Sequence, residues 1–346
     1  MRVGDDLLPR VGLWLKEKGH AGKAVVVTDT TVKGLYADLL VRSLTNAGFA
    51  VTLLEVLAGE RHKTLETAAG LYDKLTDAYA EKTTPLLALG GGVIGDLAGF
   101  AAATYMRGMP LVQVPTTLLA MVDSSLGGKT AVDKGNLKNI VGVFYQPVLV
   151  VADIDTLKTL PQEEIVNGLA EVIKAAAARN VNLFRFLEIN IDKVLKLQPE
   201  VLEDMIAEAA RIKAEIVVKD EREEKGQRLI LNFGHTVGHA IEAVSGFGLK
   251  HGQTVAIGMM AAAKISARMG LLDEGEVVRL EKLILAAGLP AKMPDLDKEA
   301  VMEAMRHDKK VRGDKIRFVL LKSIGNAFIS DGVDLTLARE VLVGWS

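Results

Sequence analysis

Histidines and one carboxylate suggest a metal site in the second half of the chain. His235 and His239, in "NFGHTVGHAIE", are four residues apart and would share one face of a helix, the spacing of helical zinc sites. His251 follows in "LKHGQTV". For the first two histidines alone, a hydrogen-bonded pair in the protein core is the simpler interpretation. The third histidine close by favours a divalent metal ion.

A carboxylate that could complete such a site lies earlier in the chain. Glu171 stands among Leu, Ala, Val and Ile in "NGLAEVIKAAAA", where burying an unpaired carboxylate would be costly. Two histidines and a carboxylate form a common ligand set of catalytic zinc. The alternative is a plain ion pair, because Lys174 is three residues further on and shares the helix face.

The stretch "LALGGGVIGDLAGF" (87–100) predicts a phosphate-binding turn. Its "GGGVIG" fits G-x-G-x-x-G between a predicted strand and a helix, where backbone amides can meet a pyrophosphate. A plain strand–helix turn would also use glycines. A standard Rossmann assignment does not fit, because the loop follows the third predicted strand and the next strand ends in Thr116 and Thr117, not in an acid. Asp29, after the first predicted strand, is better placed to hold a ribose or else caps a helix.

Several cations lie in apolar or glycine-bounded settings. Singly, each would be a surface charge; near a metal and a phosphate loop, together they indicate a substrate with phosphate or carboxylate groups. They are Arg107, Lys129, Lys138, Lys213 and Arg228. By contrast, "KDEREEKGQR" (219–228) is interpreted mostly as a solvated charged turn.

The elements that must position these residues fall into two groups. Apolar runs at 24–29, 51–56, 85–90, 111–115 and 148–153 alternate with helical segments, which predicts a Rossmann-like α/β domain with a parallel sheet over residues 1–157. Residues 158–346 are predicted to form a mainly α-helical domain, with a hairpin from 316–321 and 326–330. We expect the active cleft between the two domains.

The amino-acid composition excludes several classes of protein. The formal net charge is −2, without a long charged block, so we expect neither nucleic acid nor a membrane as partner. There is no cysteine, which excludes disulfides and thiolate metal sites. No signal peptide or membrane span is evident, so a cytoplasmic protein is expected.

The motifs together resemble one family. "GGGVIGDLAGF", "YMRG", "QVPTTLLAMVDSSLGGKTAVD", "GLAEVIK", "LNFGHTVGHAIE" and "HGQTVAIGM" are similar to those of 3-dehydroquinate synthases, from about Val3 to the C-terminal hairpin. The resemblance implies a homodimeric, NAD-dependent enzyme with zinc or cobalt. It implies cyclisation of 3-deoxy-D-arabino-heptulosonate 7-phosphate to 3-dehydroquinate in the shikimate pathway, through transient oxidation, loss of phosphate, reduction, ring opening and aldol closure.

The resemblance also assigns residues. Metal ligands match Glu171, His235 and His251, whereas His239 matches a substrate-facing histidine. Other substrate contacts match Asp123, Lys129, Asn139, Lys174, Lys213, Arg228, Asn232 and Lys309 or Lys310, with Arg107 reaching across the dimer interface. Cofactor contacts match Asp29, Glu60, Lys63, Gly91, Gly92, Val93, Ile94, Gly95, Asp96, Thr116, Thr117, Lys129, Lys138, Thr156, Thr159, Leu160 and Glu164.

The chain departs from the family pattern at a few places. Thr31 stands where many members have asparagine, Gln253 follows "HG" where glutamate is usual, and "AAAARN" replaces a more polar stretch. The start is short by most of a first strand, which puts that sheet edge in question.

Three different functions would also suit parts of this pattern. A metal-dependent polyol or glycerol-phosphate dehydrogenase would share the two-domain plan but release NADH, and would not need so many anion-binding cations. A related sugar-phosphate cyclase would act on a different substrate. A catalytically dead nucleotide-binding protein should lack at least one of Glu171, His235 and His251, yet all three are present.

Overall fold

The apolar runs of the first half form one parallel sheet. In the computed structural model the strands are β1 (Arg2–Gly4), β2 (Lys23–Asp29), β3 (Ala50–Val56), β4 (Leu86–Gly90), β5 (Leu111–Pro115) and β8 (Leu149–Asp153), in the order β1-β8-β5-β4-β2-β3. All five predicted strands are confirmed. The three-residue β1 pairs with β8, so this sheet edge is present although its strand is short.

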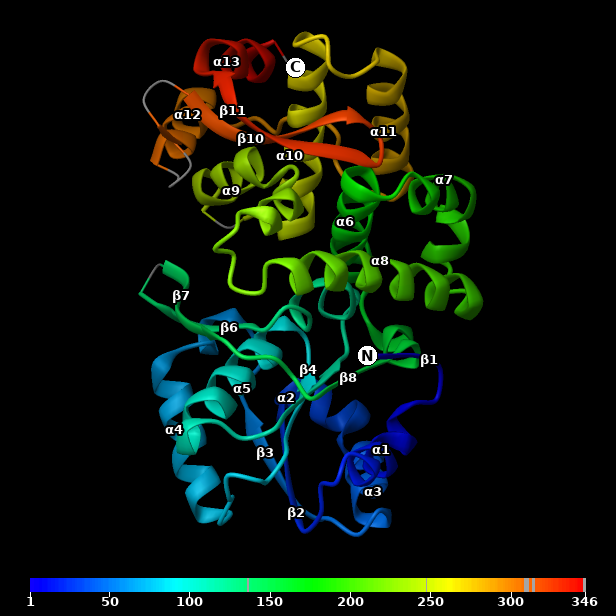
Figure 1. Cartoon of the computed structure of the whole chain (residues 1–346), viewed down its shortest axis with the longest axis vertical. Coiled ribbons are helices and arrows are strands. Elements are labelled where there is room, and N and C mark those ends of the chain that lie inside the picture. Colours follow the sequence, from blue (N-terminus) through cyan, green and yellow to red (C-terminus); the bar gives the residue numbers. More distant parts are fainter. Residues whose placement is uncertain (136, 247, 308–310, 313–314, 345–346) are drawn as a thin grey trace. The chain divides into compact units, whose positions relative to one another are not determined.

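Helices cover both faces of this sheet, which explains why its strands are apolar on both sides. Val25 and Val27 of β2 pack in a core with α4 and α5, whereas Ala24 and Val26 pack in a second core with α1 and α3. Figure 1 shows these two helix pairs on opposite sides of the strands. The bounds are α1 (Val11–Glu17), α2 (Thr30–Val32), α3 (Asp38–Asn46), α4 (Leu65–Asp77) and α5 (Gly92–Thr104). The predicted α/β class is confirmed.

The structure describes residues 1–135, 137–246, 248–307, 311–312 and 315–344. The chain forms two compact units, Met1–Pro161 and Gln162–Ser346. The boundary predicted after residue 157 falls inside a 3-10 helix, Ile154–Thr159, that continues the first unit. The division lies instead just before the first long helix of the second unit.

An antiparallel hairpin in the first unit was not predicted. It consists of β6 (Lys129–Lys134) and β7 (Leu137–Phe144), with Lys134 opposite Leu137. The sequence does carry a signal for it, because Gly135-Asn136 is a dipeptide typical of two-residue hairpin turns. The hairpin begins at Lys129 and also carries Lys138 and Asn139, all of them predicted site residues.

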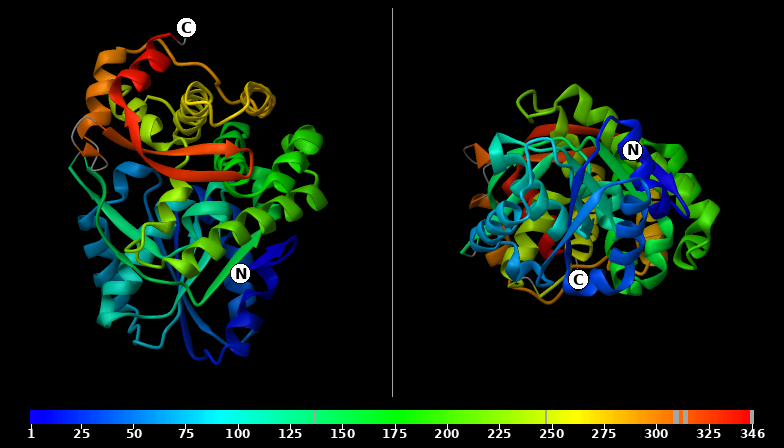
Figure 2. Two further views of the ribbon diagram at one scale, coloured as in Figure 1. Left: turned by 45° about the horizontal axis from the view of Figure 1, so that its top comes forward. Right: turned by 90° about the horizontal axis from the view of Figure 1, so that it is seen from below.

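The second unit is mainly helical, as predicted. Its elements are α6 (Gln162–Arg179), α7 (Val181–Leu195), α8 (Pro199–Lys219), α9 (His235–Val244), α10 (His251–Arg268), α11 (Glu274–Ala286), α12 (Lys298–His307), β9 (Val311–Arg312), β10 (Lys315–Ser323), β11 (Asn326–Asp334) and α13 (Leu335–Val343). The predicted hairpin is β10–β11 (Figure 2). It is tied to the helices by hydrogen bonds from Leu321 N to Ser266 Oγ (3.1 Å) and from Gly325 N to Ala177 O (2.8 Å).

Glycines allow α9 and α10 to pack backbone against backbone. A Cβ atom on Gly258 would lie 2.8 Å from the carbonyl carbon of Gly234, and closer still to its oxygen. A Cβ atom on Gly238 would lie 2.9 Å from Thr254 O. Since Gly234 precedes the first residue of α9, this contact fixes where His235 begins the helix.

None of the helices in the described part of the chain is long and apolar enough to cross a membrane.

We predict that Gly258→Ala destabilises the protein, because the added methyl group must push the two helix backbones apart. Overpacking of this kind costs about 1–3 kcal/mol. Thermal unfolding checks this prediction. Gly70→Ala in α4 is the matched control, since a Cβ atom there meets nothing within 4 Å; alanine at such a position stabilises a helix by roughly 0.5–1 kcal/mol. Equal melting temperatures for Gly258→Ala and the unmodified protein would contradict the prediction.

Candidate functional site

Three helices of the second unit bring Glu171, His235 and His251 together. Glu171 lies in the middle of α6, whereas the two histidines are the first residues of α9 and α10. Glu171 Oε1 is 3.8 Å from His235 Nε2 and 3.5 Å from His251 Nε2. Each residue offers one donor atom to a group whose atoms lie within 4.8 Å of one another. The arrangement can hold one divalent ion with an open position for a ligand.

Glu171 is nearly inaccessible and its two oxygens differ in their surroundings. Oε2 accepts an ion-pair contact from Lys174, which is also buried. Oε1 faces the two histidines and has no hydrogen-bond partner in the described part of the chain. Burial alone would raise the pKa of Glu171, but Lys174 and the two histidines hold it well below its usual range. The ion pair predicted as the alternative therefore exists, and it leaves one carboxylate oxygen for a metal.

Neighbouring acceptors orient both imidazoles so that each presents Nε2. His235 Nδ1 lies 3.3 Å from Phe233 O, and His251 Nδ1 lies 3.6 Å from Glu242 Oε2. Such contacts fix the tautomer of metal-binding histidines. Glu242 was not predicted as a site residue, although it follows His235 by seven residues and therefore shares its helix face.

The surroundings shift the pKa values of the two histidines in opposite directions. Burial, followed by the charge of Lys174, holds the pKa of His235 well below its usual range. Burial also acts to lower the pKa of His251, but its contacts with Glu171 and Glu242 outweigh this effect and raise the pKa to about 10. Because a histidine binds metal in its neutral form, metal binding at His251 would release a proton.

His239 lies beside the three-residue group without belonging to it. Its ring centroid is 5.1 Å from that of His235 and 6.3 Å from that of His251, and it is exposed whereas His235 is buried. The resemblance implies that His239 faces the substrate. This placement favours that role over a metal chelate formed by His235 and His239. Gln253, one of the family departures, accepts a hydrogen bond from Lys250 N (3.0 Å). Glutamate could accept the same bond.

The cations predicted in this unit are buried. Lys174, Lys213 on α8 and Arg228 are each less than a tenth exposed. Arg228 contacts the turn after α8, donating from Nη1 to Glu221 O (2.7 Å). That turn is mostly solvated as predicted, except for Arg228 itself and the buried Asp220, which accepts hydrogen bonds from Lys225 N and Arg228 N. Asn232 ends the following 3-10 helix (Gln227–Asn232). Lys309 and Lys310 lie outside the described residues.

In the first unit, most predicted cofactor residues follow the carboxyl ends of the parallel strands. Ligands of open α/β sheets bind at that edge, at the point where the strand order reverses. Here the order reverses between β2 and β4, since β3 lies on one side of β2 and the later strands lie on the other. The predicted cofactor residues at the end of each strand, or after it, are Asp29 (β2), Glu60 and Lys63 (β3), Gly91, Gly92, Val93, Ile94, Gly95 and Asp96 (β4), Thr116 and Thr117 (β5), and Thr156, Thr159 and Leu160 (β8). Glu164 belongs to α6 in the second unit.

The glycine loop begins α5 and is tightly packed. The first helical hydrogen bond runs from Gly95 N to Gly91 O, so the preceding amides face the helix N-terminus, where phosphates bind. Cβ atoms on Gly91 and Gly92 would lie 3.0 Å from Thr117 Cγ2 and 3.1 Å from Ser124 Oγ. The glycines therefore also serve the local packing. Both interpretations of the loop agree with this geometry.

Asp29 caps the N-terminus of α2. The sequence had left helix capping open as an alternative to ribose binding. Its Oδ1 accepts hydrogen bonds from the amides of Thr31 (2.8 Å) and Val32 (2.9 Å). Both bonds use the same oxygen, which leaves the position compatible with a ribose contact through Oδ2.

Lys63 is the centre of a charged network in the first unit. Its buried Nζ contacts Glu60 Oε1 (2.8 Å), Asn139 Oδ1 (2.8 Å) and Asp96 Oδ2 (3.4 Å), with Asp133 Oδ1 at 3.8 Å. Burial raises the pKa of Asp96 to about 6 even though Lys63 acts to lower it. The structure thus joins three predicted cofactor residues with Asn139, a predicted substrate residue.

The remaining predicted residues of this unit are less enclosed. Lys129 and Lys138 are exposed on the β6–β7 hairpin, and Asp123 lies in the helical turn Ala120–Ser124. Arg107 is exposed and has a positive φ of 63°, next to Met106 with φ 49°. A left-handed conformation at two successive non-glycine residues is uncommon and indicates a constrained segment.

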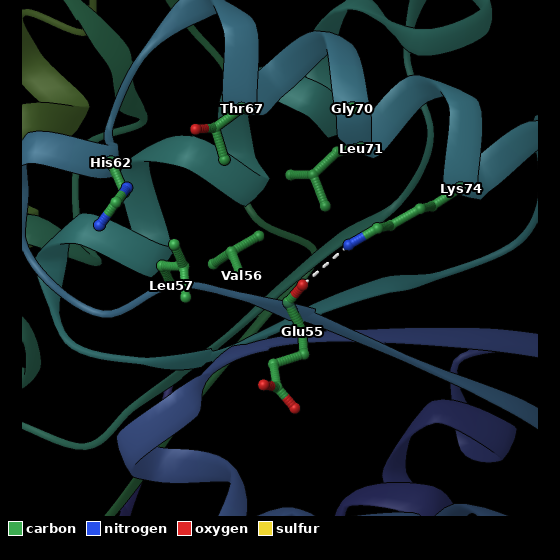
Figure 3. A pocket seen from close by; sticks show the side chains of 8 residues that line it. All are labelled: Glu55, Val56, Leu57, His62, Thr67, Gly70, Leu71 and Lys74. Carbon is green, nitrogen blue, oxygen red and sulfur yellow. Dashed lines mark hydrogen bonds between the residues drawn. The ribbon is translucent and has the colours of Figure 1, made fainter.

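A cavity of about 260 Å³ lies between β3 and α4 (Figure 3). It is lined by residues that include Val56, His62, Thr67 and Lys74, and Lys74 Nζ donates to Glu55 O (2.9 Å). None of the predicted site residues lines it. One lining residue, His62, nevertheless stands in the chain between Glu60 and Lys63.

Comparisons with known proteins agree with the motifs. Models of the 3-dehydroquinate synthase N-terminal and C-terminal regions match residues 53–167 and 168–311. A 3-dehydroquinate synthase of Dehalococcoides mccartyi (strain CBDB1) is 50% identical over 331 residues, which cover 96% of this chain and 92% of that protein.

Two solved structures are similar over nearly the whole chain. The 2-epi-5-epi-valiolone synthase ValA of Streptomyces hygroscopicus subsp. jinggangensis 5008, with NAD+ and Zn2+ bound, has a TM-score of 0.90 at 28% identity, covering 99% of this chain and 95% of that one. A 2-deoxy-scyllo-inosose synthase complexed with carbaglucose-6-phosphate, NAD+ and Co2+ has a TM-score of 0.90 at 29% identity, covering 100% and 96%.

We predict that Glu171→Ala, His235→Ala and His251→Ala each abolish binding of one divalent ion per chain, because each removes one of three protein ligands. His239→Ala is the matched control and should keep nearly full metal content. Metal analysis after dialysis against zinc measures this. Equal metal loss in the His239 variant would mean that the i, i+4 pair is the chelate.

We also predict that Asp96→Asn stabilises the protein above about pH 7, but not near pH 4. The folded-state pKa of about 6 lies above the ordinary value of 3.8, so the charged form is disfavoured by folding. This cost is nearly absent below pH 4, develops between about pH 4 and pH 6, and reaches roughly 2–3 kcal/mol above that range. Melting temperatures across this range measure it, with Asp73→Asn on the exposed face of α4 as control. A gain that does not depend on pH would contradict the assignment.

Proposed function

Because the chain belongs to the 3-dehydroquinate synthase family, we propose that it cyclises 3-deoxy-D-arabino-heptulosonate 7-phosphate to 3-dehydroquinate with release of phosphate. The observation that supports this most is the group formed by Glu171, His235 and His251. Its carboxylate oxygen Oε1 is buried without a hydrogen-bond partner among the described residues, and a metal ion would satisfy it.

The cofactors of the proposal are NAD and Zn2+ or Co2+. The chemistry of the donor set fits such an ion, since imidazole nitrogen and carboxylate oxygen suit both metals. When bound, the ion would supply Lewis acidity to a substrate hydroxyl, and the nicotinamide would supply a reversible hydride acceptor. The Gly91–Gly95 loop and Asp29 flank the reversal point of the sheet and would hold the pyrophosphate and a ribose.

The residues of the chain would bind and orient an anionic sugar-acid phosphate. Lys174, Lys213 and Arg228 are buried in the unit that carries the metal ligands, where charge-assisted hydrogen bonds to carboxylate or phosphate are strong. His239 is exposed beside the ligand group, so its imidazole can hold a proton near the reacting atoms. Asp123, Lys129, Asn139, Asn232 and one of Lys309 and Lys310 complete the proposed substrate set.

A homodimer in the cytoplasm is part of the same proposal. Leu137, Ile140 and Phe144 on β7 are between 41% and 61% exposed, as expected for apolar side chains that a second subunit covers. The constrained backbone at Arg107 suits an arginine presented to a partner. Sedimentation of the purified protein as a monomer, or recovery of the activity from a membrane or exported fraction, would contradict these parts.

We predict that phosphate accumulates over many turnovers while the absorbance of reduced nicotinamide stays flat. A substrate anchored at two anionic ends should lose phosphate and regain its hydride before it dissociates, so NAD acts catalytically. One reaction with protein, NAD+, zinc and the seven-carbon phosphate measures both signals. Stoichiometric NADH would instead identify a dehydrogenase.

The same assay tests whether the protein is a different sugar-phosphate cyclase or an inactive nucleotide-binding protein. Glucose 6-phosphate carries a phosphate but no carboxylate, and it should not be turned over; preference for it would indicate a cyclase with a different substrate. Absence of both signals together with tight NAD+ binding would indicate a nucleotide-binding protein without activity.

A further inference from the structure

The N-terminal part of α6 is hydrogen-bonded to the start of α10 next to His251. Asn167 Oδ1 accepts a hydrogen bond from Gly252 N (2.6 Å), and Asn167 is only 8% exposed. Gly252 N is one of the first amides of α10, which have no carbonyl partner within their own helix. Asn167 therefore acts as a cap for α10 that is supplied by another helix.

A second set of contacts holds the residue on the other side of His251. Asn167 Nδ2 donates to Glu164 Oε2 (3.1 Å), and Glu164 Oε1 accepts a hydrogen bond from Lys250 Nζ (2.5 Å). Lys250 also contacts Glu163 Oε1 (3.0 Å). Lys250 and Gly252, the two neighbours of His251, are thus both attached to the N-terminal part of α6.

The packing at this contact is close. A Cβ atom on Gly252 would lie 2.8 Å from Asn167 Oδ1, and closer still to the Asn167 carbonyl oxygen. Only glycine lets α10 begin so near α6. Asn167 and Glu171 are four residues apart on α6 and share a face, so one helix supplies both a proposed ligand and the contact that locates another.

We propose that Asn167 is a positioning residue that fixes His251 against Glu171, in a clamp with Glu164 and Lys250. The inference rests on the proposed metal site and adds the residue that assembles it. His251 is the first residue of its helix, where backbone fraying would move Nε2 away from Glu171 Oε1. The Lys250 ion pairs are partly exposed and contribute less than the buried amide.

The test compares Asn167→Ala with Asn190→Ala in the purified full chain. Asn190 is a partly buried asparagine of α7 whose Nδ2 donates to Phe186 O, without contact to α10 in the bonds that the structure describes. Chelator competition gives the affinity for Zn2+, and the visible absorption of bound Co2+ reports the coordination geometry. We expect Asn167→Ala to weaken metal binding about 10–100-fold and to alter the Co2+ spectrum. Asn190→Ala should leave both unchanged.

Wild-type affinity and spectrum in a folded Asn167→Ala variant would overturn the inference while leaving the proposed metal site intact. If the unmodified protein bound no metal, the proposed site and the inference would both fail. Circular dichroism checks folding. If Asn167→Ala does not fold, Lys250→Met removes only the outer part of the clamp and should weaken metal binding about threefold, as expected for a partly exposed ion pair. Unchanged affinity in that variant would then reject the clamp.

Discussion

The candidate site depends on how closely three helix backbones approach one another. Gly258 lies against Gly234 at the start of α9, and Gly252 lies against Asn167 on α6. Both contacts fall beside a helix N-terminus that carries a histidine. Because the backbones touch, the side chains of His235 and His251 reach within 4 Å of Glu171 Oε1 through their Nε2 atoms. Larger residues at these glycines would separate the ligands.

The charges buried at this point balance only in part. Glu171 forms an ion pair with Lys174, yet its second oxygen has no hydrogen bond within the described residues. Leaving a buried polar atom unpaired costs stability. A carboxylate that only stabilised the fold would have no need of an unpaired oxygen. A metal-binding carboxylate needs one oxygen for the ion. Glu242 and Phe233 O do not belong to the ligand group, but they orient the two histidines within it.

The sequence predicted the elements with strong local patterns. The five apolar strands and the β10–β11 hairpin were found because buried parallel strands are continuously apolar and hairpin strands flank a glycine. The β6–β7 hairpin was missed because β7 is exposed along nearly all of its length and its apolar residues do not alternate regularly with polar ones. Glu171, His235 and His251 could be named from residue types and family resemblance. Asn167 could not, because its role depends on a contact between α6 and α10, which are far apart in sequence. Glu242 shares a helix face with His235, but its contact with His251 depends on how α9 and α10 pack.

We infer that Glu171, His235 and His251 hold one metal ion and that His239 does not. The most direct measurement is crystallographic anomalous scattering at the zinc edge from protein loaded with Zn2+. We expect one strong peak per chain, about 2.0–2.2 Å from a Glu171 carboxylate oxygen and from Nε2 of both His235 and His251. A peak bound by His235 and His239, with Glu171 still paired only to Lys174, would contradict it.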